Sequence, residues 1–123
     1  MKTLDRKGLL KKEVCKIEQV QLDEETVVHV REMSGKERDE FENSIVKQVK
    51  VGDKMEQRQT LENFRAKLAV ATLCDEEGNP LLTIADVETL SKNMTAKTLD
   101  KIVEVASRLN KVSEKDKEEL TKN

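Results

Sequence analysis

Hydrophobic positions follow a two-residue period in the first quarter of the chain. Two runs, residues 14–22 and 26–33, alternate apolar and polar side chains on either side of the acidic stretch 23–25. Alternation that flanks a short polar link predicts a β-hairpin. A hairpin alone is only marginally stable, so we expect this one to lie on helices or to pair with another chain.

The period becomes helical at Ser34. Residues 34–37 (Ser-Gly-Lys-Glu) match a capping box, in which the serine hydroxyl accepts from the Glu37 amide and the Glu37 carboxylate accepts from the serine amide. A four-residue apolar spacing then predicts a helix over residues 35–49. The apolar positions of this stripe are Phe41, Ile45 and Val49. Residues 50–58 lack such a stripe and contain a glycine, so we expect a flexible loop there.

Four further helices are predicted downstream. Residues 59–73 carry a broad apolar face, typical of the most buried helix of a domain. A turn over 75–80 precedes a short capped helix over 83–90. The clearest stripe runs from 95 to 110, and a short charged helix is expected over 113–120. The chain is therefore predicted to be α+β, an N-terminal β-hairpin followed by about five helices, dominated by helix.

The length of 123 residues suits one domain. Residues 1–12 are largely polar and basic and contain the pair Leu9 and Leu10, and we interpret them as a flexible N-terminal arm that docks through those leucines. Residues 13–123 then form a single domain. Phe41 and Phe64 are the only aromatic residues, so the core must consist mainly of aliphatic side chains, and both rings are expected inside it.

Charge and hydropathy argue against two classes of partner. The formal net charge is -2 and both signs are mixed throughout, so the sequence offers neither the basic patch nor the aromatic rings that nucleic-acid binding uses. An apolar run of about 20 residues, as a membrane span requires, is absent from the sequence. The charged first residues predict no signal peptide, and Cys15 and Cys74 are expected to be free thiols in a reducing cytoplasm.

The residues that usually carry chemistry form no recognisable constellation. His29 stands between Val28 and Val30 and is interpreted as a solvated strand residue, and its spacing to Cys15 and Cys74 fits no zinc motif. Residues 75–79 are acidic but lack the alternation of a calcium loop, which favours a turn. The glycines are isolated, so no phosphate-binding loop is predicted. We therefore expect no catalytic residues, cofactor or metal, and no enzymatic activity.

Protein contacts are the remaining candidate function. Arg65 follows an apolar anchor on the helix expected to be most buried, and its head group either extends to solvent or pairs with an acidic residue. An unpaired strand edge in the hairpin would invite pairing between protomers. The candidate partner or oligomer contacts are Val28, Val30, Arg38, Phe41, Glu42, Phe64 and Arg65.

Several sequence blocks resemble the tail assembly chaperone family of siphophages and prophages. Residues 28–42 read VHVREMSGKERDEFE, where such proteins typically show a hydrophobic strand followed by Leu-Ser-Gly-x-Glu-Arg-x-x-Phe-Glu. The resemblance resumes in the expected order along the chain. Its further blocks are residues 63–68, 74–81, 86–90, 99–102 and 106–110.

The resemblance implies a chaperone that coats the long helical tape measure protein, keeps it soluble and recruits tail tube subunits. It implies a homo-oligomer in the cytoplasm of the bacterial host, absent from the mature virion. Many weak copies would cover long apolar stripes through multivalency. Two alternatives remain open: a structural tail or head–tail connector protein retained in the virion, and a small nucleic-acid-binding regulator.

Overall fold

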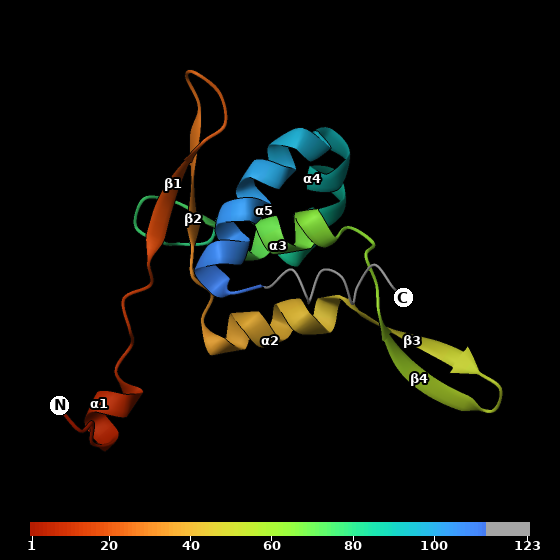
Figure 1. The fold of residues 1–123 in the computed structure, drawn as a ribbon, viewed down its shortest axis with the longest axis horizontal. Coiled ribbons are helices and arrows are strands. Elements are labelled where there is room, and N and C mark those ends of the chain that lie inside the picture. The colour runs from red at the N-terminus through yellow and green to blue at the C-terminus, as the bar shows by residue number, and fades with distance from the viewer. Residues whose placement is uncertain (113–123) are drawn as a thin grey trace.

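The computed structural model describes residues 1–112, a helical body from which a β-hairpin projects on one side (Figure 1). Helices and strands both contribute, which confirms the α+β class, but the strands form two sheets and not a single hairpin. The helix predicted over 113–120 lies outside the described residues. The elements are α1 (Arg6–Leu10), β1 (Ile17–Gln21), β2 (Val27–Arg31), α2 (Gly35–Ser44), β3 (Val46–Val51), β4 (Lys54–Gln59), α3 (Phe64–Thr72), β5 (Leu73–Cys74), the 3-10 turn η1 (Ile84–Asp86), α4 (Val87–Asn93) and α5 (Ala96–Asn110).

The predicted N-terminal hairpin is confirmed. β1 and β2 pair antiparallel, from Ile17 opposite Arg31 to Gln21 opposite Val27. β5 pairs with the other side of β2, so the strand order is β1-β2-β5 and β1 is an edge strand. α5 packs against both β1 and β2, and Val30 on β2 has no exposed surface.

α2 begins as predicted but ends early. The Ser34 hydroxyl accepts from the Glu37 amide at 3.2 Å, and the Glu37 carboxylate accepts from the Ser34 amide at 2.8 Å, which completes the capping box. The helix ends at Ser44, so the prediction of a helix over 35–49 is wrong beyond that residue. Residues 46–51 alternate valines with lysine and glutamine, and β-branched side chains favour an extended backbone.

The loop predicted over 50–58 is also wrong, because these residues complete a second hairpin. β3 and β4 pair from Val46 opposite Gln59 to Val51 opposite Lys54. The two-residue turn between them has Gly52 at φ 62°, as the first position of a type II′ turn requires. This β3–β4 hairpin projects from the end of α2, on the opposite side of the body from β1 (Figure 1).

α3 is the most buried helix, as predicted, since Ala66, Leu68 and Ala69 have no exposed surface. It begins at Phe64, later than the expected residue 59, because residue 59 belongs to β4. Asn63, just before the helix, has left-handed backbone geometry with φ 55°. The stripe predicted for 95–110 is confirmed by α5, whose inward side chains meet α3 in the core. Those buried on α5 include Leu99, Ile102, Val103 and Ala106.

The two phenylalanines lie in the core, as predicted. Phe41 on α2 is 5% exposed and Phe64 on α3 is 8% exposed. Their ring centroids are 5.8 Å apart and the rings are tilted by 58°, an arrangement that favours aromatic pairing. This contact fixes α2 against the N-terminal end of α3.

Residues 1–12 contain the short helix α1, which the hydrophobic pattern does not predict. The Asp5 carboxylate caps it by accepting from the Gly8 amide at 2.9 Å. Leu9 and Leu10 are 67% and 68% exposed, so the docking expected of these leucines is not observed. The division of the chain into a flexible arm and one domain stays a prediction.

Candidate functional site

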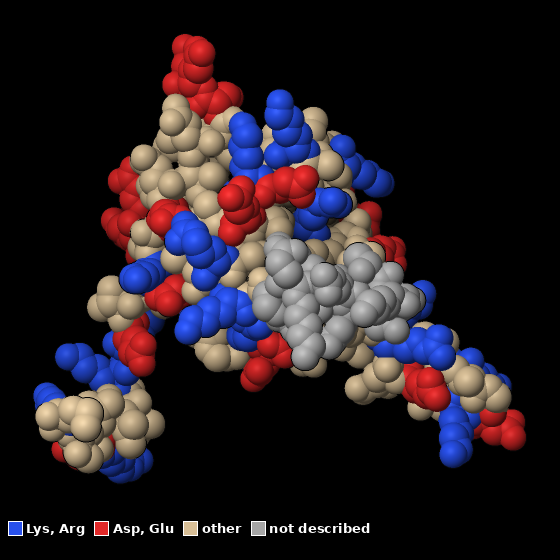
Figure 2. Space-filling view, viewed as in Figure 1, with Lys and Arg blue, Asp and Glu red and all other residues tan. Residues whose placement is uncertain are grey.

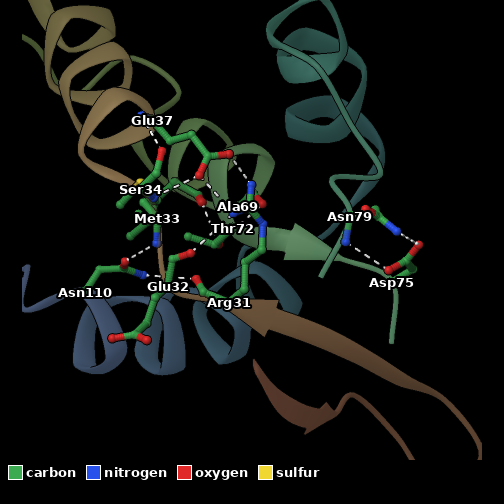
Figure 3. A network of polar contacts seen from close by, with 11 residues as sticks. Arg31, Glu32, Met33, Ser34, Glu37, Ala69, Thr72, Asp75, Asn79 and Asn110 are labelled. Atoms are coloured by element: carbon green, nitrogen blue, oxygen red, sulfur yellow. Dashed lines mark hydrogen bonds and ion pairs between the residues drawn. The ribbon is translucent and has the colours of Figure 1, made fainter. Parts of the chain in front are cut away.

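A buried ion pair joins the last residue of β2 to the first turn of α2. Arg31 is 5% exposed, and its guanidinium donates from Nη1 to Oε1 of Glu37 at 2.8 Å and from Nη2 to Oε2 (Figure 3). Glu37 is also the capping residue of α2, so one carboxylate holds the helix start and neutralises the arginine. The geometry fixes the angle at which α2 leaves the sheet.

The ion pair shifts the pKa values of both partners. The hydrogen bond from Arg31 is the largest cause that lowers the pKa of Glu37 to about 2, and the Ser34 amide adds to it against the opposing effect of burial. The same hydrogen bond raises the pKa of Arg31. Both groups therefore remain charged at neutral pH, as a structural pair requires.

Asn110 ties this junction to the end of α5 (Figure 3). Its carbonyl oxygen accepts from the Met33 amide at 2.7 Å, and its amide group donates to the carbonyl oxygens of Arg31 at 3.3 Å and Ala106 at 2.9 Å. Arg38 on α2 donates to the Asn110 backbone carbonyl as well. The start of α2 is thus held by both the sheet and the C-terminal end of α5.

Beside this junction lies an open apolar groove of about 650 Å³. Its floor is formed by α2 and α3, and its far wall by the segment that follows the 75–80 turn and enters α4. The apolar lining residues are Phe41, Val70, Ala71, Pro80, Leu82, Ile84 and Val87. Ile84 is 71% exposed at the rim, so the groove presents apolar surface to solvent.

The charged residues that line the groove come from β2, α2 and α3, and the segment 80–87 contributes none. They are Arg31, Glu37, Glu40 and Lys67. Lys67 donates from Nζ to the Ser44 carbonyl at 2.7 Å, which caps the end of α2. An apolar trough with charges along one rim suits an amphipathic segment more than a small polar substrate.

The structure places the predicted contact residues in different environments. Val30, Phe41 and Phe64 are buried in the core, and of these only Phe41 reaches the groove. Val28 is half-buried on β2. Their role in partner contacts stays a prediction, although burial removes three of them from the surface of this conformation.

The charged members of the predicted set are at the surface and paired. Arg65 donates from Nε to Oδ1 of Asp100 at 2.6 Å, so the acidic partner expected as one alternative is present, with both side chains more than half exposed. Arg38 donates to Glu42 at 2.7 Å, one turn along α2. Exposed pairs of this kind contribute little to stability.

The groove itself was not predicted from the sequence. It lies between α2, which precedes the β3–β4 hairpin, and two segments that follow the hairpin, α3 and residues 80–87. The available signal was the apolar group Leu81, Leu82 and Ile84, directly after a strong turn, where a solvated loop would be polar. Leu81 and Ile84 are indeed 61% and 71% exposed.

The acidic turn over 75–80 has a structural role. The Asp75 carboxylate accepts from the amides of Glu77 and Asn79, each at 2.9 Å. These bonds, the Asn79 amide first among them, lower the pKa of Asp75. The turn predicted here in preference to a calcium loop is confirmed.

The described residues show few other chemical groups of interest. Within residues 1–112 there is no cluster of three or more His, Cys, Asp or Glu side chains that could hold a metal ion. Cys15 and Cys74 are free thiols, and burial raises the pKa of Cys74. No helix in this part of the chain is both long enough and apolar enough to cross a membrane.

The described residues thus form a small α+β domain with an open apolar groove. A family model described as "Phage tail assembly chaperone, TAC" matches residues 3–106, most of the chain. The protein belongs to this phage tail assembly chaperone family, which confirms the resemblance noted in the sequence. Membership of a chaperone family indicates a non-enzymatic role with protein partners in tail assembly, exercised in the host cell. Searches of curated proteins and of solved structures gave no match.

Proposed function

We propose that this chaperone binds the tape measure protein through the apolar groove, keeps it soluble and recruits tail tube subunits while the tail is assembled. It acts as a homo-oligomer in the cytoplasm of the bacterial host and is not retained in the virion. The observation that carries the proposal is the groove between α2, α3 and residues 80–87, with apolar side chains open to solvent.

The groove suits one face of an amphipathic helix. A volume of about 650 Å³ accommodates a few apolar side chains, as the i, i+3, i+4 and i+7 anchors of a bound helix require. The floor formed by Phe41 and Val70 would contact those anchors. Glu40 and Lys67 on one rim would contact the polar face of the helix and set its orientation.

Each single contact of this size is weak, and self-association supplies the remaining affinity. Copies arranged along one tape measure chain would bind it at many sites, and linked weak sites bind far more tightly than one site alone. The long apolar stripes that would otherwise aggregate are then covered.

Co-expression with an apolar helical segment of the cognate tape measure protein tests the groove. The Ile84→Glu substitution places a charge at the rim without changing a buried side chain. We expect it to weaken binding by about tenfold or more, because the apolar contact is lost and a charge is desolvated. Leu9→Glu is the matched control, since Leu9 is similarly exposed, at 67% against 71%, but lies on α1.

Two results would count against the proposal. Equal soluble yield of the tape measure segment with wild type, Ile84→Glu and Leu9→Glu would exclude the groove as its binding site. Abundant peptides of this chain in purified virions, detected by mass spectrometry, would instead support a structural tail or connector protein.

A further inference from the structure

The β3–β4 hairpin has little of its own to stabilise it. Its side chains are exposed except for Val49 and Gln59, which are half-buried, and its main contact with another element is with α2. The ion pair between Arg58 and Glu56 is long, at 3.4 Å, and lies at the surface. Two-stranded hairpins are marginal in water unless a further strand or a helix supports them.

The hairpin also exposes apolar groups that a partner would cover. Val46, Val51 and Met55 are 37%, 41% and 61% exposed. The strand order within residues 1–112 leaves one edge of β3 and one edge of β4 without a neighbour. Open strand edges of this length pair readily with another chain.

A matching open edge lies on β1. Next to the two ends of β1, the Lys16 carbonyl accepts from the Glu32 amide and the Leu22 amide donates to the Thr26 carbonyl. In this register the even-numbered residues of β1 therefore bond to β2. Antiparallel pairing alternates, and the amides and carbonyls of the odd-numbered residues therefore point away from β2. Those residues are Ile17, Gln19 and Gln21. No strand among residues 1–112 pairs with this edge.

The two elements carry opposite charge. Residues 46–59 contain four basic and two acidic side chains, whereas the tip of the β1–β2 hairpin, residues 23–25, is entirely acidic. Figure 2 shows the acidic tip at the top of the molecule and the basic side chains along the β3–β4 hairpin at the lower right. Their separation prevents the hairpin from reaching β1 of its own chain.

We propose that the β3–β4 hairpin of one copy adds to the open edge of β1 in a second copy, with its basic side chains beside the acidic tip. The inference rests on the self-association in the proposed function and names the surfaces that produce it. The hairpin of one copy contacts the β1 edge of the next, so the two contacting surfaces differ and the contact is heterologous. In a pair of copies, one hairpin and one β1 edge therefore remain free. Such contacts build a ring or an open spiral of copies, not a closed dimer.

Charge reversal on full-length chains tests the pairing. Lys54→Glu with Arg58→Glu makes the hairpin acidic, and Glu24→Lys with Glu25→Lys makes the tip basic. In each double variant alone, the hairpin and the tip carry charge of the same sign. We therefore expect self-association, measured by sedimentation velocity, to weaken by about tenfold or more. An equimolar mixture of the two double variants restores opposite charge at every contact and is expected to assemble like wild type.

Backbone addition is tested separately at Gln19, whose amide points away from β2. Gln19→Pro removes this outward donor and leaves the β1–β2 hydrogen bonds in place, so it is expected to reduce self-association. Gln19→Ala keeps the amide and should behave like wild type. Lys92→Glu with Lys97→Glu, at exposed positions of α4 and α5, is the control for charge reversal. Circular dichroism verifies that every variant is folded.

The outcomes separate the inference from the proposed function. If both charge-reversal variants self-associate like wild type, or if their mixture fails to assemble, the pairing of hairpin and β1 edge is overturned while self-association stands. A Gln19→Pro variant that is folded and assembles normally also overturns it. A wild-type chain that stays monomeric at all concentrations overturns self-association itself, whereas binding of the tape measure segment is read independently from the Ile84→Glu comparison.

Discussion

Arg31 and Glu37 form a two-point ion pair that joins the end of β2 to the first turn of α2. The arginine is almost completely buried, and Glu37 is 30% exposed at its side chain. Because Glu37 also caps α2, the pair sets the direction of the helix that forms one side of the groove. Stability and groove shape therefore depend on the same carboxylate.

Removal of this carboxylate should destabilise the fold substantially. In Glu37→Gln the buried guanidinium of Arg31 loses its counter-charge, and we expect the free energy of unfolding at pH 7 to fall by about 2–3 kcal/mol. Urea denaturation measures the change. Asp39→Asn on the exposed side of the same helix is the control and should change stability by less than about 0.5 kcal/mol. Equal effects of the two substitutions would contradict the role assigned to the pair.

Acid should weaken the protein through the same residue. The pKa of Glu37 is about 2 in the folded chain and 4.5 in its ordinary state, so the folded state favours the ionised carboxylate. The resulting stability is present above pH 4.5 and is lost as the pH falls from 4.5 towards 2. Wild type should lose about 2–3 kcal/mol more than Glu37→Gln over this range in denaturant titrations. Parallel pH profiles for the two proteins would show that the pair does not couple folding to protonation.

Local sequence patterns predicted the elements whose stabilising residues are close in sequence or whose apolar stripe extends over several turns. The capping box at Ser34 and Glu37 places its signal within four residues, so the start of α2 was predicted correctly. The stripe of α5 extends over four turns, which a strand cannot imitate. In both cases the side chains that define the element also hold it together.

Elements stabilised by distant partners were not predicted. Val49 continues the four-residue spacing of Phe41 and Ile45, but it belongs to β3, because the strand over 54–59 offers backbone partners that no short window shows. The groove depends on three separate segments. Sequence periodicity identifies the apolar face of a helix, but it does not show whether another segment covers that face. Membership of the family was nevertheless recognisable, because it rests on ordered sequence blocks and not on contacts.

Asn110 should be essential for the junction between β2 and α2. Its carbonyl oxygen is the acceptor for the Met33 amide at 2.7 Å, and its amide group donates to Ala106 and Arg31. Asn110→Ala leaves these groups without partners, so hydrogen exchange at the Met33 amide should accelerate by about tenfold or more. Asn110→Asp keeps the acceptor for Met33 and should retain most of the protection at that amide. Unchanged exchange in Asn110→Ala would mean that Met33 is protected by other contacts.

The end of α5 offers a site for stabilisation. Lys111 has φ 53°, a left-handed conformation that disfavours a side chain with a Cβ atom, and the next amide, of Val112, donates to the Ser107 carbonyl at 2.9 Å. This is the Schellman arrangement in which glycine is preferred. Lys111→Gly should therefore raise the free energy of unfolding by about 0.5–1 kcal/mol, whereas Lys111→Val, with a branched Cβ, should lower it. Thermal or urea denaturation of the two variants measures the difference. A glycine variant less stable than wild type would show that the aliphatic part of Lys111 contributes more packing than its backbone strain costs.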